Sequence, residues 1–373
     1  MRKLTFPILT LILAAVVGSS VSAQESESGV RAVPTDTGYI DVHLHLRGGV
    51  LQGNTRINTQ EGYLSSAANL ISVMNQHGIE KAIVMPPPQI PNQNGPGSYE
   101  FLLKVAEDYP GRLYLLGGGK DLNELIHRYQ ENEVTDDIRE EFRQRAEAMI
   151  GAGVKGFGEM TALHYSFRPR HPFEEVQADH PLFLLLADIA AEHDLPIDIH
   201  AEALAENTSR SKAFGRASPK NPPTSLRNIP GFERLLAHNR EARIVWQHVG
   251  WDNTGHMTVD LLRRLLQAHP NLYMALKIRI NDFARQPMRN RPVDGKWNIK
   301  EEWMALFEDF PDRFVMGIDE FIDVAWDSQG SAPGDLSGGA REPFKGWSLL
   351  QQLPLELRRK VGRDNATRIY RLD

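Results

Sequence analysis

Two histidines one residue apart, His43 and His45, are the first residues of this 373-residue sequence with an evident chemical use. They end the apolar segment YIDVHLHL, which we predict to be a β-strand. Because alternate side chains of a strand share a face, both imidazoles point the same way. Two neutral imidazoles side by side form half of a site for zinc or another divalent ion. Asp41 is one step further back on that face, where it could orient a ligand.

Three more residues of metal-binding type end other apolar segments. His200 ends LPIDIH, His248 ends ARIVWQH, and Asp319 ends RFVMGID. Taken alone, His200 or His248 could instead be a core histidine whose ring nitrogens are hydrogen-bonded within the protein. Most other histidines fall in predicted helices or loops, so four strands that each end in His or Asp favour a single shared site.

The elements that must position these residues alternate regularly along the chain. Short apolar segments rich in β-branched residues are followed by helical patterns such as 182–193 and 259–269. Eight such units predict an α/β fold, a closed (β/α)8 TIM barrel with extended βα loops, rather than an open doubly wound sheet. Barrels place their chemistry at the carboxyl ends of the strands, where the His and Asp residues fall. The predicted strands are 39–46, 81–86, 112–118, 154–160, 195–202, 242–249, 271–278 and 313–319.

This set of residues resembles the amidohydrolase superfamily, with an HxH on strand 1, a His on strands 5 and 6, and an Asp on strand 8. The HVG after strand 6 and the closing stretch LELRRKVGRDNATRIYRL are similar to its amidohydrolase-related branch, which includes aminocarboxymuconate-semialdehyde decarboxylase-like proteins. The resemblance covers the chain from about Tyr39 to its end. It implies a metal-dependent hydrolase whose divalent metal, zinc by default, is bound as one or two ions. The implied metal ligands are His43, His45, His200 and Asp319, with His248 binding or orienting the attacking water and Asp319 also accepting its proton.

Strand 4 leaves two readings open. Alternation places Lys155, Phe157 and Glu159 on one face. Some members of the superfamily bridge two metals here with a carboxylated Lys and others with a Glu, and the stretch GFGEM resembles the Glu type. We therefore expect Glu159 to be a ligand of a second metal. The structural alternative pairs Glu159 with a nearby cation such as Lys277.

Basic residues in the loops suggest how a substrate could bind. Arg47 follows the HxH and Arg279 follows strand 7, and an Arg side chain suits carboxylates and phosphates. An anionic small-molecule substrate is one interpretation, and solvated loop charge is the other. Trp246, Trp251 and Trp326 either line the mouth of the barrel or belong to the core.

The amino terminus has the features of a signal peptide. Arg2 and Lys3 precede an apolar run that is too short to span a bilayer comfortably, and small residues end at Ala23. We predict cleavage after Ala23, a flexible lead over 24–38 and one barrel domain over 39–373. The protein is then exported, periplasmic or secreted, without a stable membrane anchor. A retained anchor is the alternative.

Charge and cysteine content exclude several classes. The formal net charge is −6, and it becomes −8 when Arg2 and Lys3 leave with the signal peptide. An acidic chain is a poor candidate for binding a nucleic-acid backbone. The sequence has no Cys, so disulfides, thiolate metal sites and lipid attachment at a Cys are excluded. The sequence carries no indication of the oligomeric state.

Four functions are compatible with these residues. The first is hydrolysis of an amide, lactone or ester by a metal-activated water. The second is decarboxylation, because the resembled branch includes decarboxylases, and the third is phosphoester hydrolysis, because a Glu on strand 4 is similar to TatD-like deoxyribonucleases. The fourth is a ligand-binding barrel without turnover. A complete set of clustered imidazoles and carboxylates disfavours the fourth, since keeping these groups together without a metal would be costly.

Overall fold

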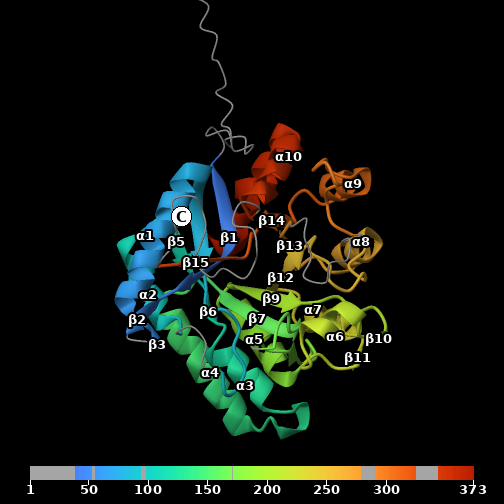
Figure 1. Ribbon diagram of the computed structural model, residues 1–373. Coiled ribbons are helices and arrows are strands. Elements are labelled where there is room, and N and C mark those ends of the chain that lie inside the picture. Colours follow the sequence, from blue (N-terminus) through green and yellow to red (C-terminus); the bar gives the residue numbers. More distant parts are fainter. Residues whose placement is uncertain (1–37, 53–54, 94–97, 170, 279–289, 325–342) are drawn as a thin grey trace, which may run out of the picture. The chain divides into compact units, whose positions relative to one another are not determined.

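The computed structural model describes residues 38–52, 55–93, 98–169, 171–278, 290–324 and 343–373. Its central sheet has eleven strands, and the parallel strands of the barrel form most of it (Figure 1). Each of the eight predicted strands is present. Their bounds are β1 (Tyr39–Arg47), β4 (Ile79–Val84), β5 (Leu113–Leu115) with β6 (Gly117–Gly118), β7 (Phe157–His164), β9 (Pro196–Ala201), β12 (Arg243–Val249), β13 (Leu272–Leu276) and β14 (Phe314–Met316).

The sheet closes on itself through the third of these strands. The strand order runs β5-β4-β1-β14-β13-β12-β9-β7-β6, and Leu116 alone separates its first member from its last. The backbone N–H of Leu116 donates to the carbonyl of Val84 at 3.1 Å, and that of Gly117 donates to Gly156 at 3.1 Å. One strand thus pairs on both sides, and the predicted (β/α)8 barrel is confirmed.

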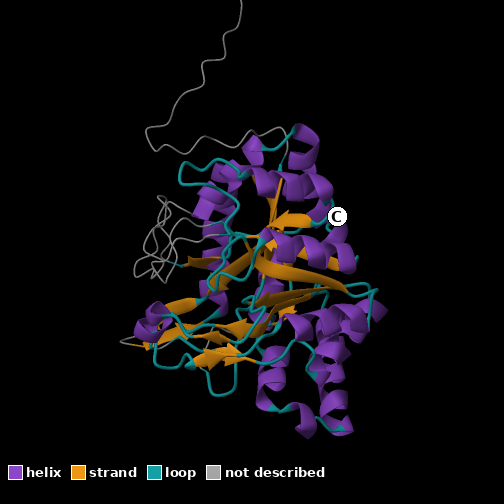
Figure 2. Cartoon of the chain, turned by 90° about the vertical axis from the view of Figure 1, so that its right-hand side faces the viewer, coloured by secondary structure: helices purple, strands orange, loops and turns teal. Residues whose placement is uncertain are grey.

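Helices surround the strands, as Figure 2 shows. The predicted helices 182–193 and 259–269 are α5 and α8, and α8 shows why such segments fold. The Thr258 side chain caps its first turn, and the leucines of one face are buried. The helices between the barrel strands are α1 (Gln60–His77), α2 (Glu100–Asp108), α3 (Asp121–Arg128), α4 (Asp136–Gly151), α5 (Pro181–Glu192), α7 (Ile229–His238), α8 (Val259–Ala268) and α9 (Glu301–Asp309).

Shorter elements extend the βα loops and the carboxyl-terminal region. Within the described residues no helix is long and apolar enough to cross a membrane. The short strands are β2 (Gly49–Gln52), β3 (Thr55–Asn58), β8 (Glu174–Glu175), β10 (Thr208–Ser209), β11 (Thr224–Ser225) and β15 (Glu320–Asp323). The short helices are η1 (Glu131–Glu133), α6 (Lys212–Ala217), η2 (Pro343–Gln352), α10 (Leu355–Arg359), η3 (Lys360–Asp364) and α11 (Asn365–Tyr370).

The barrel interior holds its own apolar cluster, separate from the larger one between strands and helices. Residues of α11 belong to it and therefore pack into the barrel beneath the site. The phenol of Tyr370 donates a hydrogen bond to Asp198 at 2.6 Å. The members of this interior cluster are Ile40, Val42, Ile83, Met85, Tyr114, Leu116, Val245, Ala275, Val315, Ala366, Ile369, Tyr370 and Leu372.

Several strands depart from regular pairing where the candidate site residues lie. Register shifts occur in β1 between Asp41 and Leu44, in β7 after Phe157, and in β12 before Val249. Such bulges change the direction in which a side chain points. One expectation fails as a result: Phe157 packs in the outer cluster, so it does not share a face with Glu159 as simple alternation requires.

Candidate metal centre

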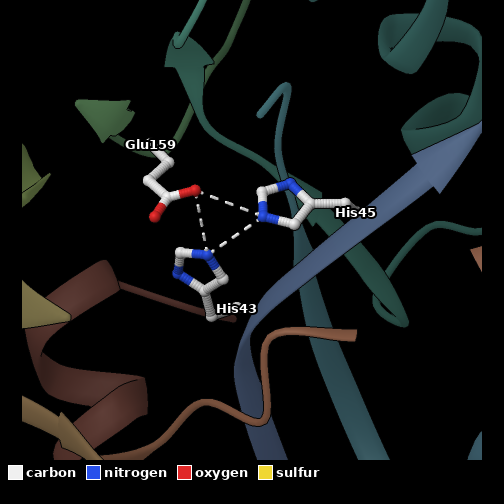
Figure 3. Close-up of side chains that lie close together, drawn as sticks. All are labelled: His43, His45 and Glu159. Atoms are coloured by element: carbon white, nitrogen blue, oxygen red, sulfur yellow. Dashed lines mark hydrogen bonds and ion pairs between the residues drawn. The ribbon is translucent and has the colours of Figure 1, made fainter. Parts of the chain in front are cut away.

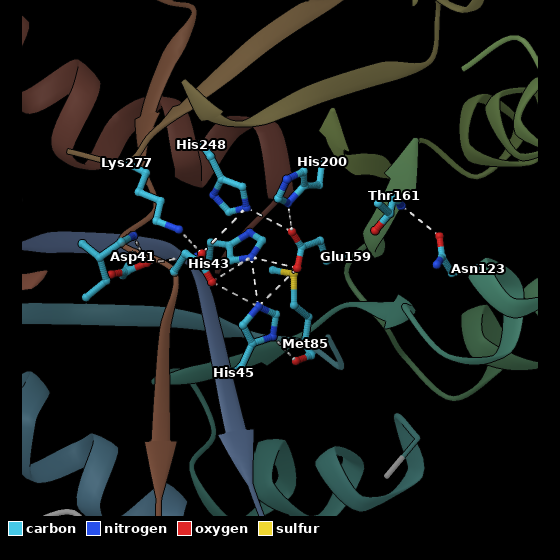
Figure 4. Close-up of polar contacts among 12 residues, drawn as sticks. Asp41, His43, His45, Met85, Asn123, Glu159, Thr161, His200, His248 and Lys277 are labelled. Atoms are coloured by element: carbon cyan, nitrogen blue, oxygen red, sulfur yellow. Dashed lines mark hydrogen bonds and ion pairs between the residues drawn. The ribbon is translucent and has the colours of Figure 1, made fainter. Parts of the chain in front are cut away.

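Six side chains from five strands meet at the carboxyl ends of the barrel strands (Figure 4). His43 and His45 come from β1, and the others are Glu159 on β7, His200 on β9, His248 on β12 and Asp319 just after β14. The histidines and Glu159 are at most 5% exposed. The structure therefore brings together all of the metal-binding residues that the sequence singled out.

Backbone conformation sets the direction of two of these side chains. His248 and Asp319 have positive φ, at 64° and 52°. Asp319 follows the last residue of β14 rather than ending a continuous strand, and its N–H donates to the carbonyl of His43 at 2.9 Å. Non-glycine residues in this region carry backbone strain and cluster at functional sites.

Three donor atoms, from His43, His45 and Glu159, lie around one point between β1 and β7, and an oxygen of Asp319 lies near both histidines. The Nε2 atoms of His43 and His45 are 3.1 Å apart, and Glu159 Oε2 lies 3.5 Å from the first and 3.3 Å from the second (Figure 3). Asp319 Oδ1 is 3.4 Å from His45 Nε2 and 3.9 Å from His43 Nε2. Ligand atoms at 2.0–2.1 Å from a tetrahedral zinc ion are about 3.3 Å apart, so the donors of His43, His45 and Glu159 fit such an ion.

The other oxygen of Glu159 faces a different pair of imidazoles. Glu159 Oε1 lies 2.8 Å from His200 Nδ1 and 3.0 Å from His248 Nε2. His200 is thus grouped with His248 and Glu159, and not with His43 and His45. One carboxylate lies between two sets of nitrogen donors.

Neighbouring groups orient the imidazole of His45. Its Nδ1–H donates to the carbonyl of Met85 at 3.0 Å, which leaves the Nε2 lone pair directed at the centre. Phe321 stacks on the ring at a centroid distance of 4.4 Å, and the guanidinium of Arg47 lies 4.4 Å above the Phe321 ring. Arg47 therefore lies beside the site, one ring removed from His45.

Burial and neighbouring charges shift the pKa values of the clustered residues. Burial alone would raise the pKa of Glu159, but His43, His200 and His248 hold that pKa well below its usual range. Burial lowers the pKa of His45, yet Asp319 and Glu159 raise it to about 9. Burial also lowers the pKa of His200, but Glu159 and Glu202 raise it to about 9. Neighbouring carboxylates thus hold protons on two imidazoles, and a divalent cation would replace those protons.

Lys277 lies at the site, but the structural alternative that paired it with Glu159 is wrong. Its ammonium pairs with Asp319 Oδ2, not with Glu159, and lies 3.6 Å above the centroid of the Trp251 ring. Burial alone would raise the pKa of Asp319, but Lys277 and His248 bring it well below its usual range. Lys277 ends the segment NLYMALK, and only the closed barrel places that end beside Asp319.

Asp41 has a different role from the one expected. Its Oδ1 accepts the backbone N–H groups of His43 at 3.0 Å and Ile318 at 3.3 Å. It therefore ties β1 to the segment that carries Asp319, instead of bonding an imidazole ring. Burial raises the pKa of Asp41 to about 8.

The remaining predicted residues separate into three groups. Lys155 lies away from the centre, 3.9 Å from the Asp373 carboxylate. Trp246 belongs to the outer core cluster, whereas Trp251 lies at the site. Arg279 and Trp326 lie outside the described residues, as does the signal peptide over 1–23.

Comparison with known proteins identifies the family. The model of the amidohydrolase family matches residues 133–372. The chain belongs to this family, whose members use divalent metals, and it is an enzyme. Among curated proteins, none matches the sequence.

Solved structures show the same fold. A probable 2-pyrone-4,6-dicarboxylic acid hydrolase from Acinetobacter baumannii, with citric acid bound, is 11% identical over 89% of this chain and 99% of its own, with a TM-score of 0.50. A lactonase template engineered for organophosphate hydrolysis is 15% identical over 91% and 98%, with a TM-score of 0.51. A 2,6-dihydroxybenzoate decarboxylase from Rhizobium is 14% identical over 90% and 99%, with a TM-score of 0.48. At these identities the likeness concerns the fold.

Proposed function

We propose that this protein is a metal-dependent hydrolase of an amide, lactone or ester bond, with two divalent ions that share Glu159. The observation that supports this is the position of the Glu159 carboxylate. One oxygen faces His43 and His45, and the other faces His200 and His248. A carboxylate between two nitrogen donor sets is the arrangement that a bridged pair of ions requires.

The two donor sets differ in how complete they are. The first comprises His43, His45 and Glu159, with Asp319 Oδ1 at 3.4 Å from His45 Nε2 as a further donor, and the second comprises Glu159, His200 and His248. The second ion would therefore keep a position for water or substrate. Ions held there would polarise the scissile carbonyl and lower the pKa of bound water. The nitrogen-rich donor set favours zinc.

The protein's own residues would then handle the proton. Asp319 stays ionised because Lys277 pairs with its Oδ2, so it could accept a proton from the attacking water and deliver it to the leaving group. Met85 fixes the ring of His45, and Glu159 fixes His200 and His248. This arrangement needs no reorganisation before reaction.

The substrate would be a small molecule with a hydrolysable carbonyl bond, and an anionic group on it is compatible with Lys277 and Arg47. The structural neighbours named above include a lactonase, a hydrolase of a pyrone dicarboxylic acid and a decarboxylase. The bridging position of Glu159 favours hydrolysis over decarboxylation, because two ions can serve both the attacking water and the carbonyl. A screen of lactones, amides and carboxylated aromatics separates the two reactions.

Metal stoichiometry tests the two-ion centre. Elemental analysis of protein purified without chelator should find about two ions per chain, and Glu159→Gln should reduce this to one or fewer. Glu174→Gln is the matched control, since Glu174 is also a buried carboxylate but belongs to none of the metal-binding groups among the described residues. If Glu159→Gln keeps both ions, or the wild type binds none after reconstitution, the proposal fails.

We also propose that the protein is exported, because Arg2, Lys3 and the apolar run to Val17 have the composition of a signal peptide and Ala23 ends its cleavage motif. The mass of the protein isolated from the producing cell tests this. A mature chain that starts at Gln24 is the expected result. A full-length chain in the cytoplasm would contradict it.

A further inference from the structure

A set of rings outside the metal-binding residues lies directly against them. The ring of His164, at the end of β7, is 4.6 Å from that of His200 between centroids. His171 follows at 4.7 Å from His164, and Phe167 lies 5.3 Å from His164 and 5.6 Å from Trp251. Trp251 in turn is 6.3 Å from His248. These four residues, the ring cluster, therefore connect the two histidines of the second donor set by a continuous path of rings.

The ring cluster contains polar atoms that the protein leaves unused. Within the described part of the chain, Nδ1 of His164 and Nδ1 of His171 are buried without a hydrogen-bond partner. A buried nitrogen without a partner costs free energy. These two nitrogens are closed to solvent, so a bound molecule would instead contact the partly exposed parts of His164, Phe167 and His171.

Hydrogen bonds centred on Ser166 order the described residues around these rings. The Asn221 side chain accepts from the N–H of Ser166 at 2.7 Å and donates to its carbonyl at 2.8 Å. Ser166 Oγ donates to the carbonyls of Arg168 at 2.9 Å and His171 at 2.7 Å. A surface that is already ordered loses little conformational entropy when a ligand binds to it.

We propose that His164, Phe167, His171 and Trp251 form a subsite for a flat ring of the substrate, so that the protein acts on lactones or esters that carry or are fused to an aromatic ring with a polar substituent. This inference rests on the proposed function, because it places the substrate beside the second donor set. Flat rings bind aromatic side chains by stacking or edge contacts. Lys277, whose ammonium lies over the Trp251 ring, adds positive charge at the same place and suits a polar or anionic substituent.

Equilibrium binding tests the subsite without turnover. Calorimetry with the metal-loaded mature protein compares benzoate with cyclohexanecarboxylate, which has the same charge and a puckered ring. Benzoate should bind about three- to tenfold more tightly, the range of one or two aromatic contacts. Phe167→Leu should remove most of this difference. Phe310→Leu, the same change at a half-buried Phe on the outer side of the barrel, should leave it unchanged.

A second variant protects the test against misfolding. If Phe167→Leu loses its thermal transition, His171→Leu removes a ring from the same cluster and is measured in its place. Equal binding of the two acids by the wild type, or an unchanged preference in a folded ring-cluster variant, overturns the proposal. A benzoate preference in a protein that hydrolyses no lactone keeps the subsite and rejects the proposed reaction, so the two failures are distinguishable.

Turnover provides a matched measurement if hydrolysis is found. Dihydrocoumarin and δ-valerolactone share a six-membered lactone, and only the first has a fused aromatic ring. The ratio of their kcat/KM values should fall about three- to tenfold in Phe167→Leu, through KM for dihydrocoumarin. An unchanged ratio contradicts the subsite, whatever the absolute rates.

Discussion

Metal binding by this protein should release protons, in a number that the structure specifies. A metal takes the imidazole lone pair, so any proton on that nitrogen must leave. The carboxylates of Glu159 and Asp319 raise the pKa of His45 to about 9, and Glu159 and Glu202 do the same for His200. At pH 7 both imidazoles of the metal-free protein are protonated, so filling the two ion sites should release about two protons per chain.

The same shifts set the size of the pH dependence. At pH 7, about two units below the pKa, displacing each proton costs about 3 kcal/mol, which weakens each ion about 100-fold relative to pH above 9. The product of the two association constants should therefore rise about 100-fold per pH unit up to about pH 9. In the metal-free protein, protonation of His45 and His200 also stabilises the folded state. This stabilisation is complete below about pH 6.5, the ordinary pKa of histidine, and is lost as the pH rises through about 9.

Calorimetry in two buffers of equal pH and different ionisation enthalpy measures the protons released. Zinc titrated into metal-free protein at pH 7 should give a value near two. Glu159→Gln should lower the value, because Glu159 raises both pKa values, whereas Glu174→Gln should not. Release of fewer than about half a proton, or an affinity that does not rise with pH, would refute the reasoning.

Three further predictions follow from the same geometry. Replacing His43 and His45 together by Ala should lower the metal content to one ion per chain or fewer, measured by elemental analysis, because only the donors of Glu159, His200 and His248 remain together, and it should leave the circular dichroism spectrum unchanged, because the apolar interior cluster lies beneath the site; a double variant with full metal occupancy would show that the centre is misplaced. Asp319→Asn should keep metal content near normal while kcat falls roughly two to four orders of magnitude, since it removes the proton acceptor; near-full activity would assign the base to another residue. Tyr370→Phe should cost about 1–3 kcal/mol in urea unfolding, because Asp198 loses its buried hydrogen bond; an unchanged midpoint would mean that the bond contributes nothing.

Local pattern was enough to predict the barrel and most of the residues at its centre. Apolar strands of regular length, each followed by a helical pattern, determine an α/β barrel because every unit must bury one face against the next. The position of His200, His248 and Asp319 near strand ends follows from chain order alone, since parallel strands bring their carboxyl ends to one rim. The convergence of these residues with His43 and His45 could thus be inferred before any coordinates.

The tertiary structure decided how these residues divide between ions and which neighbours they have. Simple alternation placed Phe157 beside Glu159 and Asp41 beside the histidines, and the register shifts in β7 and β1 changed both relations. The pairing of Lys277 with Asp319, and the contact of His164 with His200, join residues far apart or on different strands. Bulges and strand-to-strand contacts depend on hydrogen bonds between distant segments, and a period-two pattern within one segment carries no information about them.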